Sequence, residues 1–300
     1  MLHSKALVAL TILFLALGPH AQELCQVCRQ PISNGYRVGN SAYCAEHWQN
    51  GLPQCSNCGI SITGEYKAVG PDRIPFCQNC MTSHPACYLC ASPADPKTGG
   101  QKLPDGRHLC GLDRQTAVFS AQRARELFDL AIREVTAALG PRMALKKPVK
   151  EVRLVDVPGL VTVSQGLYQP ASVASGKVLG LTQLVLKSRG QERWTEPATV
   201  YLLNGVPEER FVTVSAHEYA HAWHAENHPQ YSQTTPEMRE GFAEWVAYKV
   251  AQHTRRTRQT ATLNQPAPTI YYTGLRKFLE LERKVGAAGV LHHATTATDI

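Results

Sequence analysis

Ten cysteines form a repeated spacing pattern that limits how the first part of the chain can fold. They fall into three successive sets, and none is left over. Each set opens with a CxxC pair and closes, after 15, 18 or 19 further residues, with two residues that are three positions apart. The three tetrads are Cys25, Cys28, Cys44 and His47; then Cys55, Cys58, Cys77 and Cys80; then Cys87, Cys90, Cys110 and Asp113.

This spacing is typical of structural zinc sites. A CxxC turn directs two thiolates at one ion, and a short hairpin returns the second pair to complete a tetrahedron. The sequence therefore predicts three closed zinc sites, with Asp113 a harder ligand than the thiolates. A closed site leaves no position for water, so the free energy of metal binding serves folding. Disulfide bonds are the alternative for an even cysteine count in an exported chain.

The composition of residues 22–115 fits a LIM-like region that is folded by metal ions. Gly, Pro, Ser and Asn are frequent there, and the apolar runs are short. A zinc ribbon that binds nucleic acid would need a stripe of basic residues with exposed aromatic rings. Acidic residues are instead interspersed through 25–113, and ionised thiols with bound zinc would leave the +7 chain only weakly positive. We therefore expect no nucleic-acid partner.

The N-terminal residues carry a secretory signal pattern. Lys5 precedes an apolar run over residues 6–17, interrupted only by Thr11, and a Gly-Pro-His-Ala stretch follows it. These twelve residues are too few to span a bilayer, which takes about 20 residues in a helix. We predict that residues 1–21 are a signal peptide cleaved near Ala21, and that the protein is exported, periplasmic or secreted, without stable membrane insertion. Retention of the segment as an anchor is the alternative.

Residues 116–300 have the pattern of a second domain of the α+β class. Apolar residues recur at helical spacing over 116–139, and Gly140-Pro141 ends this helix. Residues 152–155, 178–186 and 198–203 are rich in Val, Leu and Thr and are candidate strands. The chain turns helical from Glu208 onward. Strands followed by helices favour an antiparallel or mixed sheet.

The pentapeptide His217-Glu218-Tyr219-Ala220-His221 is an HExxH motif. Four-residue spacing on a helix places both imidazoles on one face, where they can hold one ion. Glu240 follows on a second helical segment that begins after Thr234-Thr235-Pro236. Three protein ligands leave a fourth position for water, whose pKa zinc lowers to about 7. Glu218 would then act as the general base.

Other polar side chains near this motif are expected to have supporting roles. Glu244, four residues after Glu240, is an alternative ligand, and its better interpretation is a carboxylate that orients a ligand histidine. His224 and His228 lack the spacing of a ligand pair and are expected at the surface or in a pocket.

The HExxH motif, eighteen residues and then Glu-Gly-Phe-Ala-Glu resemble the gluzincin metallopeptidases. In that class the glutamate before the glycine is the third zinc ligand, which points to Glu240. The order of parts over residues 25–293 is similar to that of the LIM-domain peptidases of the DA-one family. These parts are the CxxC modules, Leu-Pro-Asp-Gly-Arg-His-Leu-Cys, the helix at 116–139, Ala-Thr-Val-Tyr-Leu-Leu-Asn-Gly-Val-Pro, HEYAHAW, Tyr-x-x-Gly and Gly-Val-Leu-His-His.

The resemblance implies a LIM-like zinc region joined to a gluzincin-type peptidase that cuts proteins. It implies one catalytic zinc on His217, His221 and Glu240, with Glu218 as base, and up to three structural zincs. The LIM-like region would position a protein or peptide substrate, or a protein partner. Here seven residues separate His47 from Cys55, whereas a regular LIM domain joins its two sites by two residues.

Two further expectations concern the substrate. Thr199–Leu203 would be the sheet edge beside the zinc, able to bind an extended peptide by main-chain pairing, or else a plain core strand. No carboxylate occurs from Tyr201 to Val206, so an endopeptidase is favoured over an aminopeptidase. Tyr271 and Tyr272 are candidates for stabilising the oxyanion, or are packing residues. The alternative function is a non-catalytic zinc-module adaptor that mediates protein binding, which would have no need of Glu218.

Overall fold

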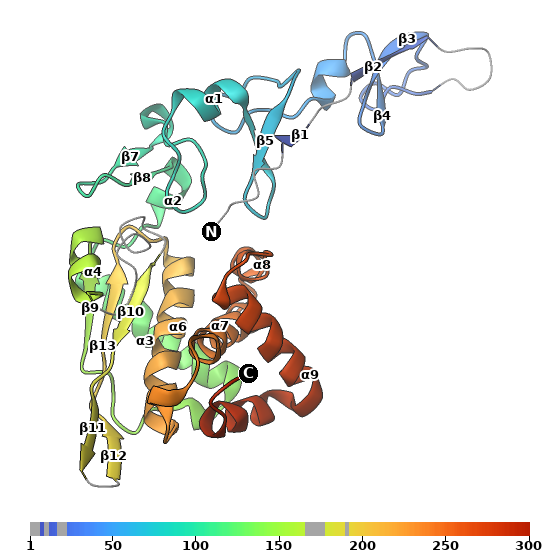
Figure 1. Cartoon of the computed structure of the whole chain (residues 1–300). Coiled ribbons are helices and arrows are strands. Elements are labelled where there is room, and N and C mark those ends of the chain that lie inside the picture. The colour runs from blue at the N-terminus through green and yellow to red at the C-terminus, as the bar shows by residue number, and fades with distance from the viewer. Residues whose placement is uncertain (1–6, 9–11, 17–22, 166–177, 190–191) are drawn as a thin grey trace. The chain divides into compact units, whose positions relative to one another are not determined.

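The computed structural model describes residues 7–8, 12–16, 23–165, 178–189 and 192–300. The chain forms two compact units with several small sheets (Figure 1). The smaller, which we call the cysteine-rich unit, comprises His3–Lys102 and His108–Gly111. The larger, which we call the helical unit, comprises Leu103–Arg107 and Leu112–Ile300. The predicted mixture of helices, sheets and cysteine-rich clusters is confirmed.

The cysteine-rich unit repeats one structural motif three times. Each CxxC turn is closed by an isolated β-bridge, which joins Leu24 to Pro31, Gln54 to Ser61 and Ala86 to Pro93. A two-stranded antiparallel hairpin follows each turn. The hairpins are β3 (Asn34–Val38) with β4 (Ser41–Cys44), β5 (Tyr66–Val69) with β6 (Ile74–Cys77), and β7 (Gln101–Lys102) with β8 (His108–Leu109).

The CxxC turns share a left-handed residue directly after the second cysteine. Arg29, Gly59 and Ala91 have φ values of 59°, 73° and 64°. In the first turn the N–H of Cys25 donates to the carbonyl of Gln30 at 2.9 Å, and the N–H of Arg29 donates back to Cys25 at 2.9 Å. The same pair of bonds recurs in the other two turns. The two cysteine side chains of each turn are therefore presented by the same backbone geometry.

The elements between the hairpins are short, and the apolar clusters are small. The helices of the cysteine-rich unit are η1 (Trp48–Gly51), α1 (Gln78–Ser83) and η2 (Pro96–Thr98), and α2 (Gly111–Gln115) begins at the last residue of this unit. One cluster gathers Ile62 and Phe76 with the buried Cys55 and Cys80. Two cysteines of the second tetrad therefore form part of this small cluster, as expected where metal binding would supplement a core.

Part of the predicted signal segment is described as strands. Strand β1 (Leu7–Val8) pairs with β5, and β2 (Ile12–Ala16) pairs with β3, both antiparallel. The predicted cleavage point near Ala21 lies outside the described residues. In the part of the chain that is described, no helix is both long enough and apolar enough to cross a bilayer.

A three-stranded mixed sheet forms one layer of the helical unit. Its order is β10 (Gly180–Gln183), β13 (Thr199–Leu203), β9 (Glu151–Val155), with β13 antiparallel to β10 and parallel to β9. The expectation that Thr199–Leu203 forms the sheet edge is therefore wrong. Val200, Leu202 and Leu203 are fully buried, which favours a central strand, and β10 and β9 are the two edge strands.

The strand predicted over 178–186 divides into two elements. Strand β10 ends at Gln183, and the chain continues into the hairpin of β11 (Leu186–Arg189) and β12 (Glu192–Thr195), which extends beyond the sheet (Figure 1). The helix predicted over 116–139 is α3 (Ala121–Leu139). It begins later than predicted because Ser120 caps it, accepting a bond from Arg123 N.

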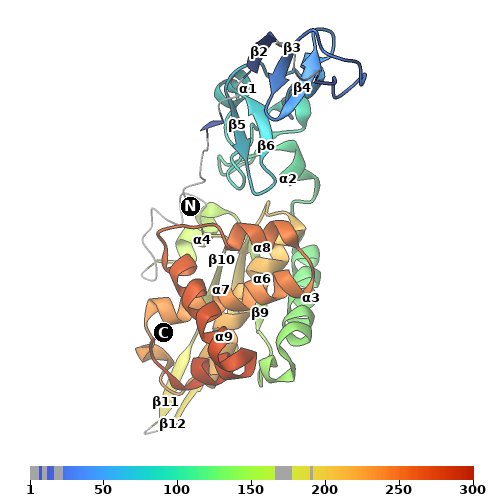
Figure 2. The same cartoon turned by 90° about the vertical axis from the view of Figure 1, so that its right-hand side faces the viewer.

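Three helices pack in succession from the sheet outward, and a fourth packs beside them (Figure 2). Helix α6 (Glu208–Asn227) lies on β10 and β13, α7 (Pro236–His253) packs on α6, and α9 (Ile270–Thr296) packs on α7. Helix α3 contacts both α6 and α7. The remaining helical segments are η3 (Pro141–Met143), α4 (Val157–Val163), η4 (Tyr231–Gln233) and α8 (Thr257–Leu263).

The boundaries of α7 follow the local sequence. Thr235 caps the helix by accepting from Met238 N, and Pro236 occupies the first turn, where a missing N–H costs nothing. The predicted start after Thr234-Thr235-Pro236 is thus confirmed. Because α7 lies between α6 and α9, a side chain on its inner face, such as that of Glu240, points into the interior of the unit.

Candidate metal centres

Helices α6 and α7 bring three potential ligands together. His217 and His221 lie one turn apart on α6, and their Nε2 atoms are 3.1 Å from each other. Glu240 Oε2 of α7 is 3.2 Å from His217 Nε2 and 3.4 Å from His221 Nε2. The three side chains are at most 12% exposed. Among the described residues, they form one of four His, Cys, Asp or Glu groups that could hold a metal ion.

The size of this triangle fits zinc. Zinc bonds of 2.0–2.1 Å in a tetrahedron separate neighbouring ligand atoms by about 3.3 Å. The three observed separations lie on either side of that value. Two neutral imidazoles and one carboxylate are also a donor set that zinc accepts in catalytic sites. We therefore treat His217, His221 and Glu240 as a triad fitted to one Zn²⁺.

Glu244 lies on the other side of the His217 ring. Its Oε2 is 3.0 Å from His217 Nδ1, whereas Glu240 faces Nε2. A bond at Nδ1 fixes that nitrogen as the donor and leaves Nε2 free to bind metal. In the metal-free protein, burial opposes the charge of His217, but the bonds to both carboxylates outweigh it and raise its pKa well above its ordinary value.

Glu218 points from α6 toward the edge strand β10. Its side chain is 5% exposed, and Thr182 Oγ1 lies 2.8 Å from both its Oε2 and its main-chain oxygen. Burial raises the pKa of Glu218, against the attraction of His217 and His221. A carboxylate held beside the triad but outside it has the placement expected of a base rather than a ligand.

Tyr271 is the one of the two candidate tyrosines whose ring lies beside the triad. Its ring centroid is 6.0 Å from that of His217. Burial, and then the carboxylates of Glu240, Glu218 and Glu244, raise its pKa. Tyr271 therefore stays protonated and can donate a hydrogen bond. Its neighbour Tyr272 is half-buried in the first turn of α9, where its N–H donates to Thr269 Oγ1.

His224 and His228 are buried, so of the two placements expected from sequence, at the surface or in a pocket, the surface is wrong. His224 is fully buried and packs its ring against Phe242 and Tyr231. His228 is 4% exposed and binds through both nitrogens, with Nε2 2.9 Å from Ala297 O and Nδ1 accepting from Gln230 N. Both are buried because α7, η4 and α9 close over the end of α6, which local spacing does not reveal.

The three cysteine tetrads are each assembled in one place. In all three, the four ligand atoms lie within 4.8 Å of one another. All ten cysteines are free. Sγ separations of 3.9 Å between Cys58 and Cys77 and 3.6 Å between Cys90 and Cys110 match the spacing of about 3.8 Å that zinc–sulfur bonds of 2.3 Å produce. A disulfide would need about 2.05 Å.

Two of the CxxC turns ionise their first cysteine readily. Burial opposes the charge of Cys25, but main-chain N–H groups of Cys44, Cys28 and Val27 lower its pKa to about 6. Main-chain N–H groups likewise lower the pKa of Cys55 to about 7. Because zinc binds the thiolate, a lowered pKa suits Cys25 and Cys55 to the role of metal ligands.

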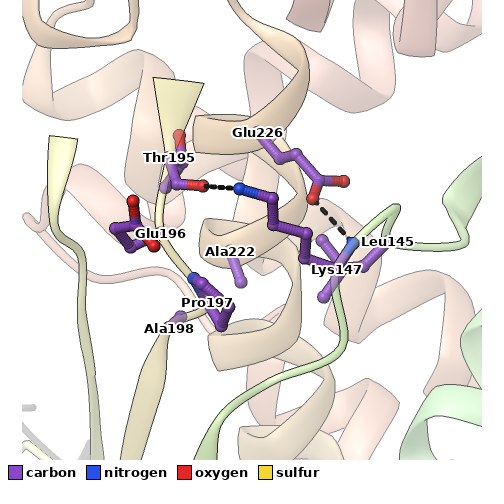
Figure 3. A pocket seen from close by; sticks show the side chains of 8 residues that line it. All are labelled: Leu145, Lys147, Thr195, Glu196, Pro197, Ala198, Ala222 and Glu226. Carbon is purple, nitrogen blue, oxygen red and sulfur yellow. Dashed lines mark hydrogen bonds between the residues drawn. The ribbon is translucent and has the colours of Figure 1, made fainter. Parts of the chain in front are cut away.

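A small hollow beside Ala222 and Glu226, one to two turns beyond Glu218 along α6, is not a ligand site. It is lined by Leu145, Lys147, Thr195, Glu196, Pro197, Ala198, Ala222 and Glu226 (Figure 3). Its volume of about 10 Å³ has room for roughly one water molecule. Glu226 accepts bonds from the N–H groups of Lys146 and Lys147 at 2.7 and 3.0 Å. These contacts anchor the end of α6.

Comparison of the chain with protein-family models, with curated proteins and with solved structures gives no match.

Proposed function

We propose that the protein is a zinc-dependent peptidase whose site lies where α6, α7 and β10 meet. The observation that carries the proposal is the combination of the His217, His221 and Glu240 triad with a separate buried carboxylate, Glu218, on the adjacent side. A closed structural site would need four ligands and no additional acid. Three protein ligands, which leave a position for water, and a separate base are what zinc-dependent hydrolysis requires.

Each residue has a distinct role in the proposed reaction. A bound Zn²⁺ would supply a Lewis acid that lowers the pKa of water and polarises a peptide carbonyl. Glu218 takes the proton from the attacking water and delivers it to the leaving amine. Glu244 holds His217 in the orientation that presents Nε2. Tyr271 donates a hydrogen bond to the oxygen on which negative charge develops.

The edge strand β10 is the proposed docking position for substrate. Among the described residues, β10 pairs only with β13, on one of its two sides. A sheet edge can pair with an extended peptide through main-chain hydrogen bonds. Strand β10 is Gly-Leu-Thr-Gln and carries no carboxylate that could hold a free amino terminus. These features support cleavage within a chain, that is, an endopeptidase.

We propose a different role for the three cysteine tetrads. Each has four ligands, so it would hold zinc for folding and leave no position for a reacting molecule. The cysteine-rich unit would then bind a protein partner or a segment of the substrate. Its exposed apolar residues Leu24, Val27 and Ile60 lie in or beside the CxxC turns, where they could contact such a chain.

The experiment compares the parent protein with Glu218→Gln on fluorescently quenched casein, a generic unfolded protein. The amide cannot accept the proton, so the rate should fall by about 10²–10⁴-fold. Because Glu218 is not a ligand, the variant should keep the same zinc content, which elemental analysis measures. His221→Ala should lose both the activity and one zinc. Equal rates for the parent and Glu218→Gln would refute the peptidase and leave the adaptor interpretation.

A further inference from the structure

Two residues of β10 limit where the carboxylate of Glu218 can lie, and no sequence motif identifies them as part of the site. Thr182 Oγ1 lies 2.8 Å from Glu218 Oε2 and 2.8 Å from Glu218 O. Two positions earlier on the same strand, Gly180 leaves space for the other carboxylate oxygen. A Cβ atom at Gly180 would lie 2.6 Å from Glu218 Oε1 and 2.8 Å from its Cγ.

The spacing of these two residues follows from strand geometry. Side chains at positions i and i+2 of a strand point to the same face. Gly180 and Thr182 therefore both face α6, on the side where Glu218 lies. Gly180 is fixed opposite Leu202 and Thr182 opposite Val200 of the buried strand β13. The central strand thus holds both residues in register with the helix.

We propose that Gly180 and Thr182 form a cradle that sets the position of the Glu218 carboxylate, with Thr182 as a positioning residue for the base. This inference rests on the proposed peptidase function. Thr182 holds Oε2, and the missing side chain of Gly180 gives Oε1 a place to lie. The carboxylate is therefore constrained at both oxygens, one by a bond and one by the shape of the strand.

The hydroxyl of Thr182 suits a base that changes its protonation state. It has one hydrogen and can also accept. With Glu218 ionised, the hydrogen points to Oε2, where a charge-assisted bond is strongest. With a proton on Oε2, that proton can be donated to Oγ1, while the threonine hydrogen turns to Glu218 O, at the same distance. Thr182 thus has a partner in both states of the reaction.

The test uses an isosteric change and a matched control. Thr182→Val keeps the branched shape of a strand residue and removes the hydroxyl, whereas Thr182→Ser keeps the hydroxyl. The control is Thr195→Val. Thr195 Oγ1 donates to Ala225 O of the same helix at 3.0 Å, so this change also removes one strand-to-α6 hydrogen bond, but far from the carboxylate.

We expect Thr182→Val to lower kcat on quenched casein by about 10–100-fold, since small misplacements of a reacting group cost rates of this order. KM and zinc content should stay within about twofold of the parent. Thr182→Ser should restore most of kcat, and Thr195→Val should not change it. Crystal structures of zinc-loaded parent and Thr182→Val give a readout besides activity: the carboxylate should move in the variant.

The outcomes separate this inference from the proposed function. If Thr182→Val cleaves as fast as the parent while Glu218→Gln does not cleave, the cradle is wrong and the peptidase stands. If Thr195→Val loses as much activity as Thr182→Val, a general packing effect replaces the cradle. If the parent is no faster than Glu218→Gln, the peptidase is wrong. An unmoved carboxylate in the Thr182→Val crystal then overturns the cradle as well, whereas a displaced one supports it.

Discussion

His224 is a buried histidine that the proposed chemistry does not use. It lies one helical turn beyond His221, and neither of its ring nitrogens has a hydrogen-bond partner. The main chain of Ala294 is close enough to favour the charged ring but does not form a hydrogen bond. Burial, and then the charges of His221, His228 and Arg239, lower the pKa of His224 to about 3. The ring is thus neutral in the folded protein.

This burial makes the stability depend on pH. Because an unfolded histidine has a pKa of about 6.5, the unfolded chain takes up this proton more readily than the folded one. The stabilisation that comes from keeping His224 neutral is therefore fully present above pH 6.5 and decreases as the pH falls toward 3. At pH 5 the free energy of unfolding should be lower by about 2 kcal/mol from this residue alone. His224→Phe keeps the aromatic packing and should remove this loss, as urea unfolding at pH 7.5 and pH 5 with equal free zinc measures.

The control for His224 is His253→Gln, at an exposed position on α7. This change should leave the pH dependence of the parent intact, including the part that comes from metal release. An equal loss of stability for the parent and His224→Phe between the two pH values would show that His224 does not titrate in this way.

Single residues differ in how far the sequence predicts them. His217, His221 and Glu240 could be proposed because their spacing is local to two helices, and the structure brings them together. Thr182 and Gly180 could not, since an ordinary strand residue acquires its contact only when β10 packs on α6. Of Tyr271 and Tyr272, the first lies at the triad because of the rotation of α9, which adjacent positions in a sequence do not specify.

At the scale of elements, α7 and α9 cross with their backbones in contact. A Cβ atom at Gly241 would lie 2.7 Å from Gly274 Cα, and one at Gly274 would lie 2.6 Å from Gly241 Cα. Gly241 follows Glu240, and Gly274 follows Tyr271 by three residues. Glu237 adds bonds to Thr273 and Lys277 at 2.7 and 2.8 Å. The two glycines therefore set how closely Tyr271 approaches the triad.

Gly241→Ala and Gly274→Ala should each destabilise the helical unit. The added Cβ would overlap backbone atoms of the facing helix, which cannot move aside as a flexible side chain can. Overpacking of this kind costs about 1–3 kcal/mol, which urea unfolding followed by the fluorescence of Trp223 and Trp245 would measure. The control is Ala288→Ser, a change at an exposed position of the same helix α9 that lies outside the crossing. A cost for Ala288→Ser as large as for the other two would contradict this account.

Helices and strands were predicted correctly where their own residues determine them. They were predicted less well where contacts with other elements determine their position. Helices α6 and α7 follow from spacing and capping residues. Strands β10 and β13 lie within predicted strands, and β9 begins one residue before its predicted strand. Of the two positions expected for β13, the sheet edge is wrong and the core strand is the one found. Its order depends on β9, which arrives from more than 40 residues earlier and pairs in parallel.

At the scale of the whole molecule, four separate clusters predict four bound zinc ions. Elemental analysis of gently purified protein should give about four equivalents. A chelator should remove the ion of the His217, His221 and Glu240 triad first, because that site has three protein ligands and the others have four. Activity would then be lost with three zincs retained. One zinc together with five disulfides would instead show that the cysteines pair with each other.

The general architecture was predictable because its determinants are repeated or local. The spacing of the cysteines indicated three metal sites, and the hydrophobic periodicity indicated a mixed α/β unit after them. The close glycine crossing and the burial of His224 were not predictable, because they arise where helices distant in the sequence meet.

Each of the four clusters is closed by a short stretch of chain: the outer ligands of the first are 22 residues apart, and those of the triad 23. Loop-closure entropy grows only slowly with length and is small for such loops. Metal capture can therefore occur locally, before distant parts of the chain have met. A protein built in this way would assemble module by module, and the supply of zinc during synthesis would decide which modules form first.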